Sequence, residues 1–221
     1  MTLSKSKTQM LVLAFLSFFS TVSHSNIITW DDVMNSSGTL DVLNEGNLVQ
    51  AINATTSNSG SVSVNGVIFA NSNTLLSSVF AGALSGSSTG DTGYNALLTT
   101  FNYGGGSAAF SLSLGNDGLV VNNNYLVQVW FTDLRNDRDM LFGDGSGNNV
   151  LVNSSQGGLG QYVTGAFTAT SDNLSLLLDA QGFGNAHITA FQIREVTEVP
   201  TPATLLLFGL ALLGLNFSRR K

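Results

Sequence analysis

The sequence predicts an all-β fold, an antiparallel β-sandwich or jelly roll of about 8–9 strands with one short helix. Short runs of alternating or β-branched residues recur along the body of the chain. Glycine, serine, asparagine and threonine crowd the breaks between these runs, as turn residues do. Almost no stretch carries a long helical period, and we find no internal repeat of fixed length.

The chain begins with a pattern that predicts a secretory signal peptide over residues 1–25. Two lysines precede any acid, residues 10–19 form an apolar core, and small serines follow. This order of basic, apolar and small residues is typical of a cleaved export signal, whose apolar core is helical. Cleavage between Ser25 and Asn26 places small residues at the two restricted positions, and cleavage after Ser23 is the alternative.

The predicted body spans residues 26–195 and contains the strand-like segments. They are residues 47–53, 61–64, 66–70, 108–114, 125–132, 149–152, 161–170, 174–179 and 187–194. In segment 125–132 both alternating faces are mostly apolar, which predicts a central strand in a sheet that is covered on both sides. Residues 94–101 have apolar side chains spaced for one or two helical turns.

The end of the chain predicts a short membrane-directed segment. Residues 196–202 form a linker with the sequence Val-Pro-Thr-Pro at its end, and residues 203–221 contain an apolar run followed by Arg-Arg-Lys. The run covers residues 203–215, whereas a helix that crosses a bilayer needs about 20 apolar residues. The terminal cations favour the cytoplasmic side. We therefore expect a hydrophobic helix that holds the protein at the membrane for a short time during export. The alternatives are an ordinary C-terminal anchor and a buried terminal helix.

This arrangement resembles the PEP-CTERM sorting signal of Gram-negative bacteria. Val199, Pro200 and Pro202 match its proline box, Thr201 stands where the family usually has Glu, and the terminal cluster is matched by Arg219 and Arg220. The resemblance implies cutting by exosortase, a membrane protease, after an intermediate at the inner membrane. It also implies delivery to the cell surface or to an extracellular matrix rich in exopolysaccharide, which makes extracellular polysaccharide a candidate partner.

The body has a second resemblance, carried by ordered pieces of strand. They are a Val-Asn-Gly-Val-x-Phe strand at residues 64–69, a Val-Trp-Phe-Thr-Asp end at 129–133, a glycine-rich strand at 160–169 and a last strand that ends at Arg194. Together they resemble the bodies of other secreted proteins with the same tail, which are similar to galactose-binding-like jelly rolls. The resemblance implies the fold and leaves the ligand open.

Charge and cysteine content exclude several function classes. All 14 acids lie between residues 31 and 198, where three arginines and no lysine oppose them, so the exported body carries a formal charge of about −11. Such a surface repels nucleic acid and anionic lipid, while divalent cations and neutral or hydrogen-bonding polymers remain suitable partners. The chain has no cysteine, which excludes a disulfide scaffold and thiolate chemistry.

The search for a catalytic constellation is negative, and we assign no catalytic or cofactor-binding residue. The chain has two histidines; His24 lies in the signal peptide and His187 in the last predicted strand, where packing is the more common role. No cysteine–histidine pair and no phosphate loop ending in Lys-Ser or Lys-Thr is present. Glycoside hydrolysis needs only two carboxylates, and no pair stands out. We interpret the chain as not an enzyme.

One dense polar cluster, residues 133–139, is followed by Asp144 in a glycine-rich turn. Calcium takes six to eight oxygen ligands, and the cluster offers a set of carboxylates, Asp133, Asp137, Asp139 and Asp144. The alternative is a solvated turn in which Arg135 and Arg138 pair locally with the aspartates. The two arginines favour this alternative, because they compete with a cation.

The same loops suggest a saccharide site, since jelly rolls often bind sugars at one end through an aromatic face. The candidate platforms are Trp30, Trp130, Tyr103 and Tyr162. Core packing explains Trp130 better, because it lies in the middle of a strand, and Trp30 is expected near an edge. Two hypotheses follow: a non-enzymatic surface or matrix protein, or a carbohydrate-binding module, with a secreted hydrolase as a weaker variant of the second.

Overall fold

In the computed structural model, the structure describes residues 26–84, 87–106, 108–135, 138–153, 158–182 and 184–196. The expected signal helix, the proline box and the hydrophobic helix at 203–221 lie outside these residues. Among the described ranges, no helix combines the length and apolar character that crossing a bilayer requires. The described body is built almost entirely from strands, as the sequence predicts.

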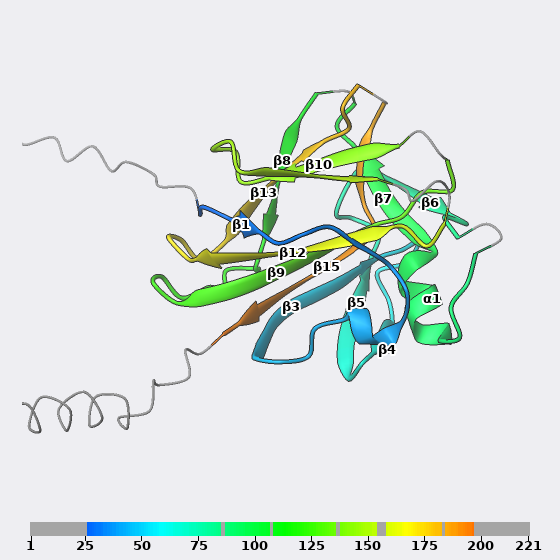
Figure 1. Ribbon diagram of the computed structural model, residues 1–221, viewed down its shortest axis with the longest axis horizontal. Coiled ribbons are helices and arrows are strands. Elements are labelled where there is room, and N and C mark those ends of the chain that lie inside the picture. The colour runs from blue at the N-terminus through cyan, green and yellow to red at the C-terminus, as the bar shows by residue number, and fades with distance from the viewer. Residues whose placement is uncertain are drawn as a thin grey trace, which may run out of the picture.

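Three sheets make up the body (Figure 1). The largest has the order β1-β12-β9-β15-β3-β5-β4, with β2 also on β12; these strands are β1 (Thr29–Trp30), β2 (Met34–Asn35), β3 (Asn47–Ala54), β4 (Ser61–Val64), β5 (Val67–Ser72), β9 (Asn124–Phe131), β12 (Gln161–Thr168) and β15 (Ala190–Glu195). The second has the order β11 (Asn149–Asn153), β10 (Asp139–Gly143), β13 (Leu174–Asp179) and β8 (Phe110–Leu114). The third joins β14 (Ala186–Ile188), β7 (Thr100–Gly104) and β6 (Ser78–Ala81).

The main core lies between the eight-stranded and four-stranded sheets. Alternate residues of β9 point into it, among them Val127, Val129 and Phe131, and they share one apolar cluster with Leu176 and Leu178 of β13. All these side chains are buried. The alternation of strand side chains delivers every second residue to this layer. The prediction of an all-β sandwich is therefore confirmed.

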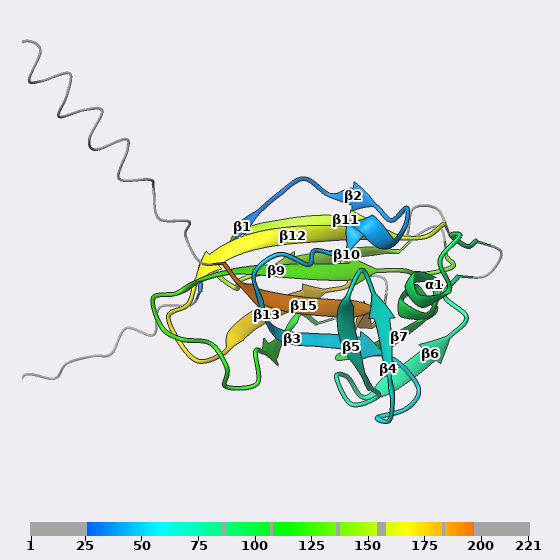
Figure 2. The same ribbon diagram turned by 90° about the horizontal axis from the view of Figure 1, so that it is seen from below.

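The opposite face of the large sheet is also covered (Figure 2). Helix α1 (Thr92–Leu98) and the 3-10 turn η1 (Thr39–Asp41) lie on this side. Trp130 of β9 is fully buried here, meets Phe69 edge to face at 5.8 Å, and donates from its indole N–H to the Tyr94 hydroxyl at 3.2 Å. The expectations that β9 is central and that Trp130 belongs to a core are confirmed.

One pair of strands departs from the expected antiparallel pattern. β3 and β5 are parallel, with Ile52 opposite Ala70. The loop after β3 carries the chain past one strand position, so β4 pairs at the outer edge. The two-residue turn at Asn65 and Gly66, both with positive φ, then returns β5 into the gap. This turn type suits a tight hairpin, and the reversal sets β5 parallel to β3.

Other element boundaries also differ from the predictions. The single strand expected at 187–194 is two strands, because Thr189 breaks it: its N–H donates to the Trp130 carbonyl and its hydroxyl accepts from the Thr132 N–H. The helix starts earlier than expected because Asp91 caps the Tyr94 N–H at 2.6 Å. Five strands, β1, β2, β6, β7 and β10, were not predicted; β1 and β2 have two residues each, too short for a visible pattern.

Both ends of the described chain lie at one end of the sandwich. The Val196 N–H donates to the carbonyl of Asn124, the first residue of β9. The Asn26 side chain is held by two hydrogen bonds: it accepts from the Thr170 N–H at 2.6 Å and donates to the Asn173 carbonyl at 2.9 Å. Figures 1 and 2 show both ends on the left and α1, β6 and β7 on the right. The last residue of β9 therefore points away from the exit of the tail.

Gly160 tests the packing between β12 and β9. Gly160 and Gly145 have nearly the same φ, +78° and +76°, but a Cβ at Gly160 would overlap the Phe131 carbonyl oxygen, whereas at Gly145 it meets nothing within 4 Å. Gly145→Ala should cost about 1–2 kcal/mol of unfolding free energy, the cost of a side chain in left-handed backbone. Gly160→Ala should cost clearly more, because backbone atoms must move. Urea unfolding of residues 26–196 measures both, and equal losses would contradict the described packing.

Candidate functional site

A cleft of about 240 Å³ opens at the end of the sandwich opposite the exit of the tail. Strands β6 and β7 form one side, and the segment after β9 and the segment before β14 form the other. The side chains that line it are three aromatic rings, two guanidinium groups and an amide: Phe80, Phe101, Tyr103, Arg135, Arg138 and Asn185. The cleft therefore combines an apolar surface with hydrogen-bond donors.

The aromatic wall follows from the pairing of β6 with β7. Phe80 and Phe101 are directly opposite in the ladder, and their rings stack with centroids 5.0 Å apart. Tyr103 lies two residues further along the same face of β7, and its ring meets Phe101 at 6.1 Å. Phe80 is 36% exposed while Phe101 is buried. The partly exposed ring of Phe80 thus stacks on the buried ring of Phe101.

His187 forms the floor behind this wall. Its imidazole stacks between the rings of Phe101 and Phe131, with centroid distances of 4.2 Å and 4.3 Å. Burial, helped by the charges of Arg135 and Arg138 and opposed by Asp133, lowers its pKa from the ordinary 6.5 to about 3. The histidine is therefore neutral at pH 7. It forms no ion pair with Asp133, although its Nε2 lies 3.7 Å from an Asp133 oxygen. Packing is its role, as expected.

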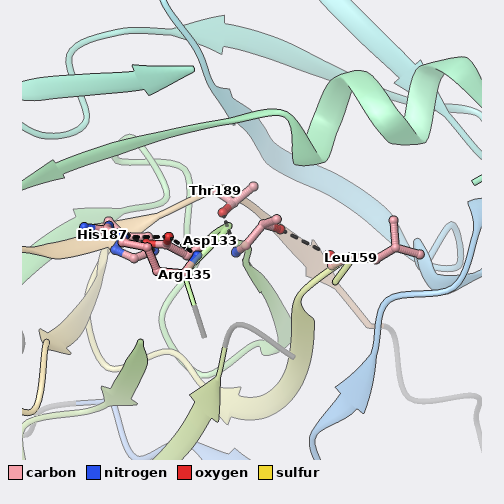
Figure 3. A network of polar contacts seen from close by, with 6 residues as sticks. Asp133, Arg135, Leu159, His187 and Thr189 are labelled. Atoms are coloured by element: carbon pink, nitrogen blue, oxygen red, sulfur yellow. Dashed lines mark hydrogen bonds and ion pairs between the residues drawn. The ribbon is translucent and has the colours of Figure 1, made fainter. Parts of the chain in front are cut away.

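Asp133 is completely buried and holds Arg135 (Figure 3). Its Oδ1 accepts from the Arg135 backbone N–H at 2.9 Å and from Nε at 2.8 Å, and its Oδ2 accepts from Nη2. Burial alone raises the pKa of the Asp133 carboxyl, but these donors and the neighbouring charges outweigh burial and leave the pKa below its ordinary value. The local pairing of an arginine with an aspartate in this cluster, weighed from the sequence, is present.

The calcium candidates do not meet in the described residues. Asp139 begins β10 and Asp144 follows its end, so about five residue steps of roughly 3.3 Å separate them. Asp144 already accepts from the Ile28 N–H at 3.0 Å and the Asn148 amide at 2.7 Å. No group of three metal-binding side chains occurs among the residues that the structure places. Asp137 lies outside them, and a calcium site that includes it stays a prediction.

The aromatic platforms proposed from the sequence are dispersed. Tyr103 lines the cleft. Trp30 is on β1 at the sheet edge, as expected, and donates from its indole N–H to the Asn148 carbonyl at 3.1 Å. Trp130 is in the core, and Tyr162 borders a second, acidic groove that also contains Asp31, Asp32 and Asp41. Phe80 and Phe101 were missed as site residues; the i, i+2 spacing of Phe101 and Tyr103 was the available signal.

The neutral state of His187 predicts how stability depends on pH. Its pKa is 6.5 when exposed and about 3 when folded, so the unfolded chain binds an extra proton between these values. Stability is then full above pH 6.5 and falls as the pH drops, by up to about 1.4 kcal/mol per unit. Since His187 is the one histidine of the body, His187→Gln should remove the slope between pH 6.5 and 5. Urea unfolding across this window decides it; a wild-type protein without the slope would refute the assignment.

The comparisons with known proteins concern the end of the chain. Residues 198–221 match the family model described as the PEP-CTERM protein-sorting motif. This range contains Val199, Pro200, Pro202, Arg219 and Arg220, the residues that carry the resemblance in the sequence. No curated protein and no solved structure matches the chain, so the resemblance of the body to galactose-binding-like domains is not confirmed. The chain thus carries a C-terminal sorting signal of the kind that exosortase processes, which indicates export and sorting at a membrane.

Proposed function

We propose that the mature protein is a non-enzymatic structural or adhesive module at the surface, or in the extracellular matrix, of a Gram-negative bacterium. The observation that carries the proposal is the sorting motif at residues 198–221. The signal peptide predicted at residues 1–25 supports the same route. The tail holds the body at the inner membrane until exosortase removes it, and the body is then delivered outside.

The placement of the ends supports this route. Asn26, the first residue after the predicted cleavage point, is hydrogen-bonded through its side chain to residues 170 and 173, so a body that begins there has its first residue fixed to the fold. Val196, the last described residue, pairs with the start of β9. The cleft opens beyond the other end of β9, at the end of the sandwich opposite Val196.

The chemistry of the body supports a non-enzymatic role. His187 is the one imidazole of the body, and two phenyl rings cover its faces. Its pKa of about 3 means that no imidazolium acid is present at neutral pH and that the neutral ring is a weak base. General acid–base catalysis instead favours a group whose pKa lies near the working pH. The polar network around Asp133 is better explained as support for the cleft.

A carbohydrate-binding module is the second candidate, and the cleft is the observation that favours it. Sugar sites combine an aromatic surface for the C–H face of the ring with a few fixed polar groups. Phe80 and Tyr103 offer the surface, and the polar groups are supplied by Arg135, Arg138 and Asn185. The two candidates are compatible, because a matrix protein that adheres to polysaccharide needs such a contact.

The sorting route predicts the mass of the mature protein. In cells with exosortase, we expect an N-terminus near Asn26 and a C-terminus near Pro200. In cells that lack exosortase, the tail should remain attached and the protein should stay in the membrane fraction. Intact-mass spectrometry of the purified protein measures both ends. A full-length mass in both strains, or a cytosolic protein, would overturn the route.

The saccharide contact predicts a specific loss when the outer ring of the cleft is removed. Phe80→Ala should weaken retention on an array of matrix polysaccharides by at least about fivefold. Truncating an aromatic anchor costs more than about 1 kcal/mol of binding free energy, which corresponds to that factor. Ile68→Ala is the matched control, because Ile68 is exposed on β5, outside the cleft. Equal effects of the two changes, or no retention of the wild type on any polysaccharide, would count against the module.

A further inference from the structure

Cationic side chains are scarce in the exported body, and two of its three arginines lie at the cleft. Arg194 is buried and donates to backbone carbonyls of residues 44–46, so its charge serves the fold. Arg135 and Arg138 line the cleft. The body has no lysine and a formal charge of about −11. Two of the three cationic side chains of the body therefore meet at the cleft, although Asp133 already compensates the charge of Arg135.

The guanidinium of Arg135 is held in a fixed orientation. Asp133, which is completely buried, accepts from both Nε and Nη2, while 45% of the Arg135 side chain stays exposed. A planar guanidinium suits carboxylate geometry, and one that is already fixed loses little entropy when a ligand binds. Burying a carboxylate is costly unless it is paired, so the arrangement is more than a chance surface contact.

The aromatic wall adds a second requirement on the ligand. Phe80 and Tyr103 lie in the same cleft as the two arginines, so the ligand needs an apolar ring face beside an anionic group. We propose that this cleft binds an acidic saccharide, with the aromatic rings against the C–H face of a uronic acid unit and the guanidinium groups receiving its carboxylate. This inference rests on the proposed saccharide contact and specifies its charge class.

The size of the cleft and the charge of the body limit the alternatives. About 240 Å³ is below the roughly 300–1,000 Å³ of sites that enclose a drug-sized ligand, so the cleft takes one or two units of a chain. A polyphosphate or nucleic acid would bring many charges against a body whose formal charge is about −11. A single uronic acid unit instead brings one carboxylate to the two guanidinium groups of the cleft.

The test compares one sugar chain with and without its charge. Isothermal titration calorimetry on the full-length chain, in mild non-ionic detergent, uses trigalacturonic acid and its methyl ester, which has the same rings and no carboxylate charge. We expect the acid to bind at least about tenfold more tightly than the ester, since one charge-assisted contact is worth that much. Inorganic phosphate alone should bind more weakly than the acidic sugar.

Two variants with the same change of net charge locate the effect. Arg138→Gln should raise the Kd for the acid by about tenfold and leave the ester unchanged. Asn122 lies in an exposed turn before β9, at the far end of the sandwich. Asn122→Asp should change the Kd by less than about twofold, because salt screens distant charges. A thermal melt of Arg138→Gln checks that the body is folded.

The outcomes separate this inference from the proposal on which it rests. Equal binding of acid and ester overturns the charge class and leaves the saccharide contact standing. Failure of both sugars to bind overturns the saccharide contact and the inference together. Phosphate binding as tight as that of the acid identifies a simple anion site and overturns the inference. Equal losses in the two variants place the charge effect outside the cleft and do the same.

Discussion

The buried carboxylate of Asp133 is the interaction on which the architecture of the cleft depends. A carboxylate without solvent must be paired, and here the partner is Arg135, two residues further along the chain. The pairing closes a local turn between residues 133 and 135 and sets a guanidinium at the cleft. The same carboxylate lies 3.7 Å from His187, whose ring supports Phe101 from below. The buried carboxylate of Asp133 thus positions the Arg135 guanidinium and also lies beside His187, the ring that packs against Phe101.

The sandwich makes this arrangement possible because β9 is covered on both faces. Its inward residues fill the main core, while Trp130 on the other face packs under α1. A strand fixed in this way places Asp133, two residues beyond its end, at a defined position. Thr189 completes the support: it separates β14 from β15, so that His187 joins the small sheet with β7 while Phe191 stays in the core.

The parts of the fold that were predictable are those with strong local patterns. The run 125–132 is apolar on both faces, and the structure places it at the centre of the large sheet. Tertiary context decides the rest. β7 was hidden because Phe101 continues the apolar spacing of Leu97 and Leu98, which drew the start of this strand into the expected helix. Only the Asp91 cap fixes where the helix starts. The parallel partner of β3 depends on a loop and a turn that no periodic pattern reveals.

The candidate site was predictable only in part, for the same reason. The arginine–aspartate pairing is two residues apart, so the sequence contains it. The acidic cluster also suggested calcium, but the length of β10 separates Asp139 from Asp144. The meeting of β6, β7 and the segment after β9 joins residues 80, 101 and 135, which are far apart in the chain. Contacts between residues so far apart depend on the tertiary fold and leave no local pattern in the sequence. The scarcity of cationic residues was the one sequence feature that drew attention to Arg135 and Arg138.

We infer that the body contacts its ligand at the cleft above Asp133. Nuclear magnetic resonance of a ¹⁵N-labelled body, titrated with an acidic trisaccharide, tests it most directly. The account predicts that the largest shift changes fall on Tyr103, Arg135 and Asn185, with little change at the acidic groove beside Tyr162. Shifts concentrated at that groove, around Asp31 and Asp32, would contradict it.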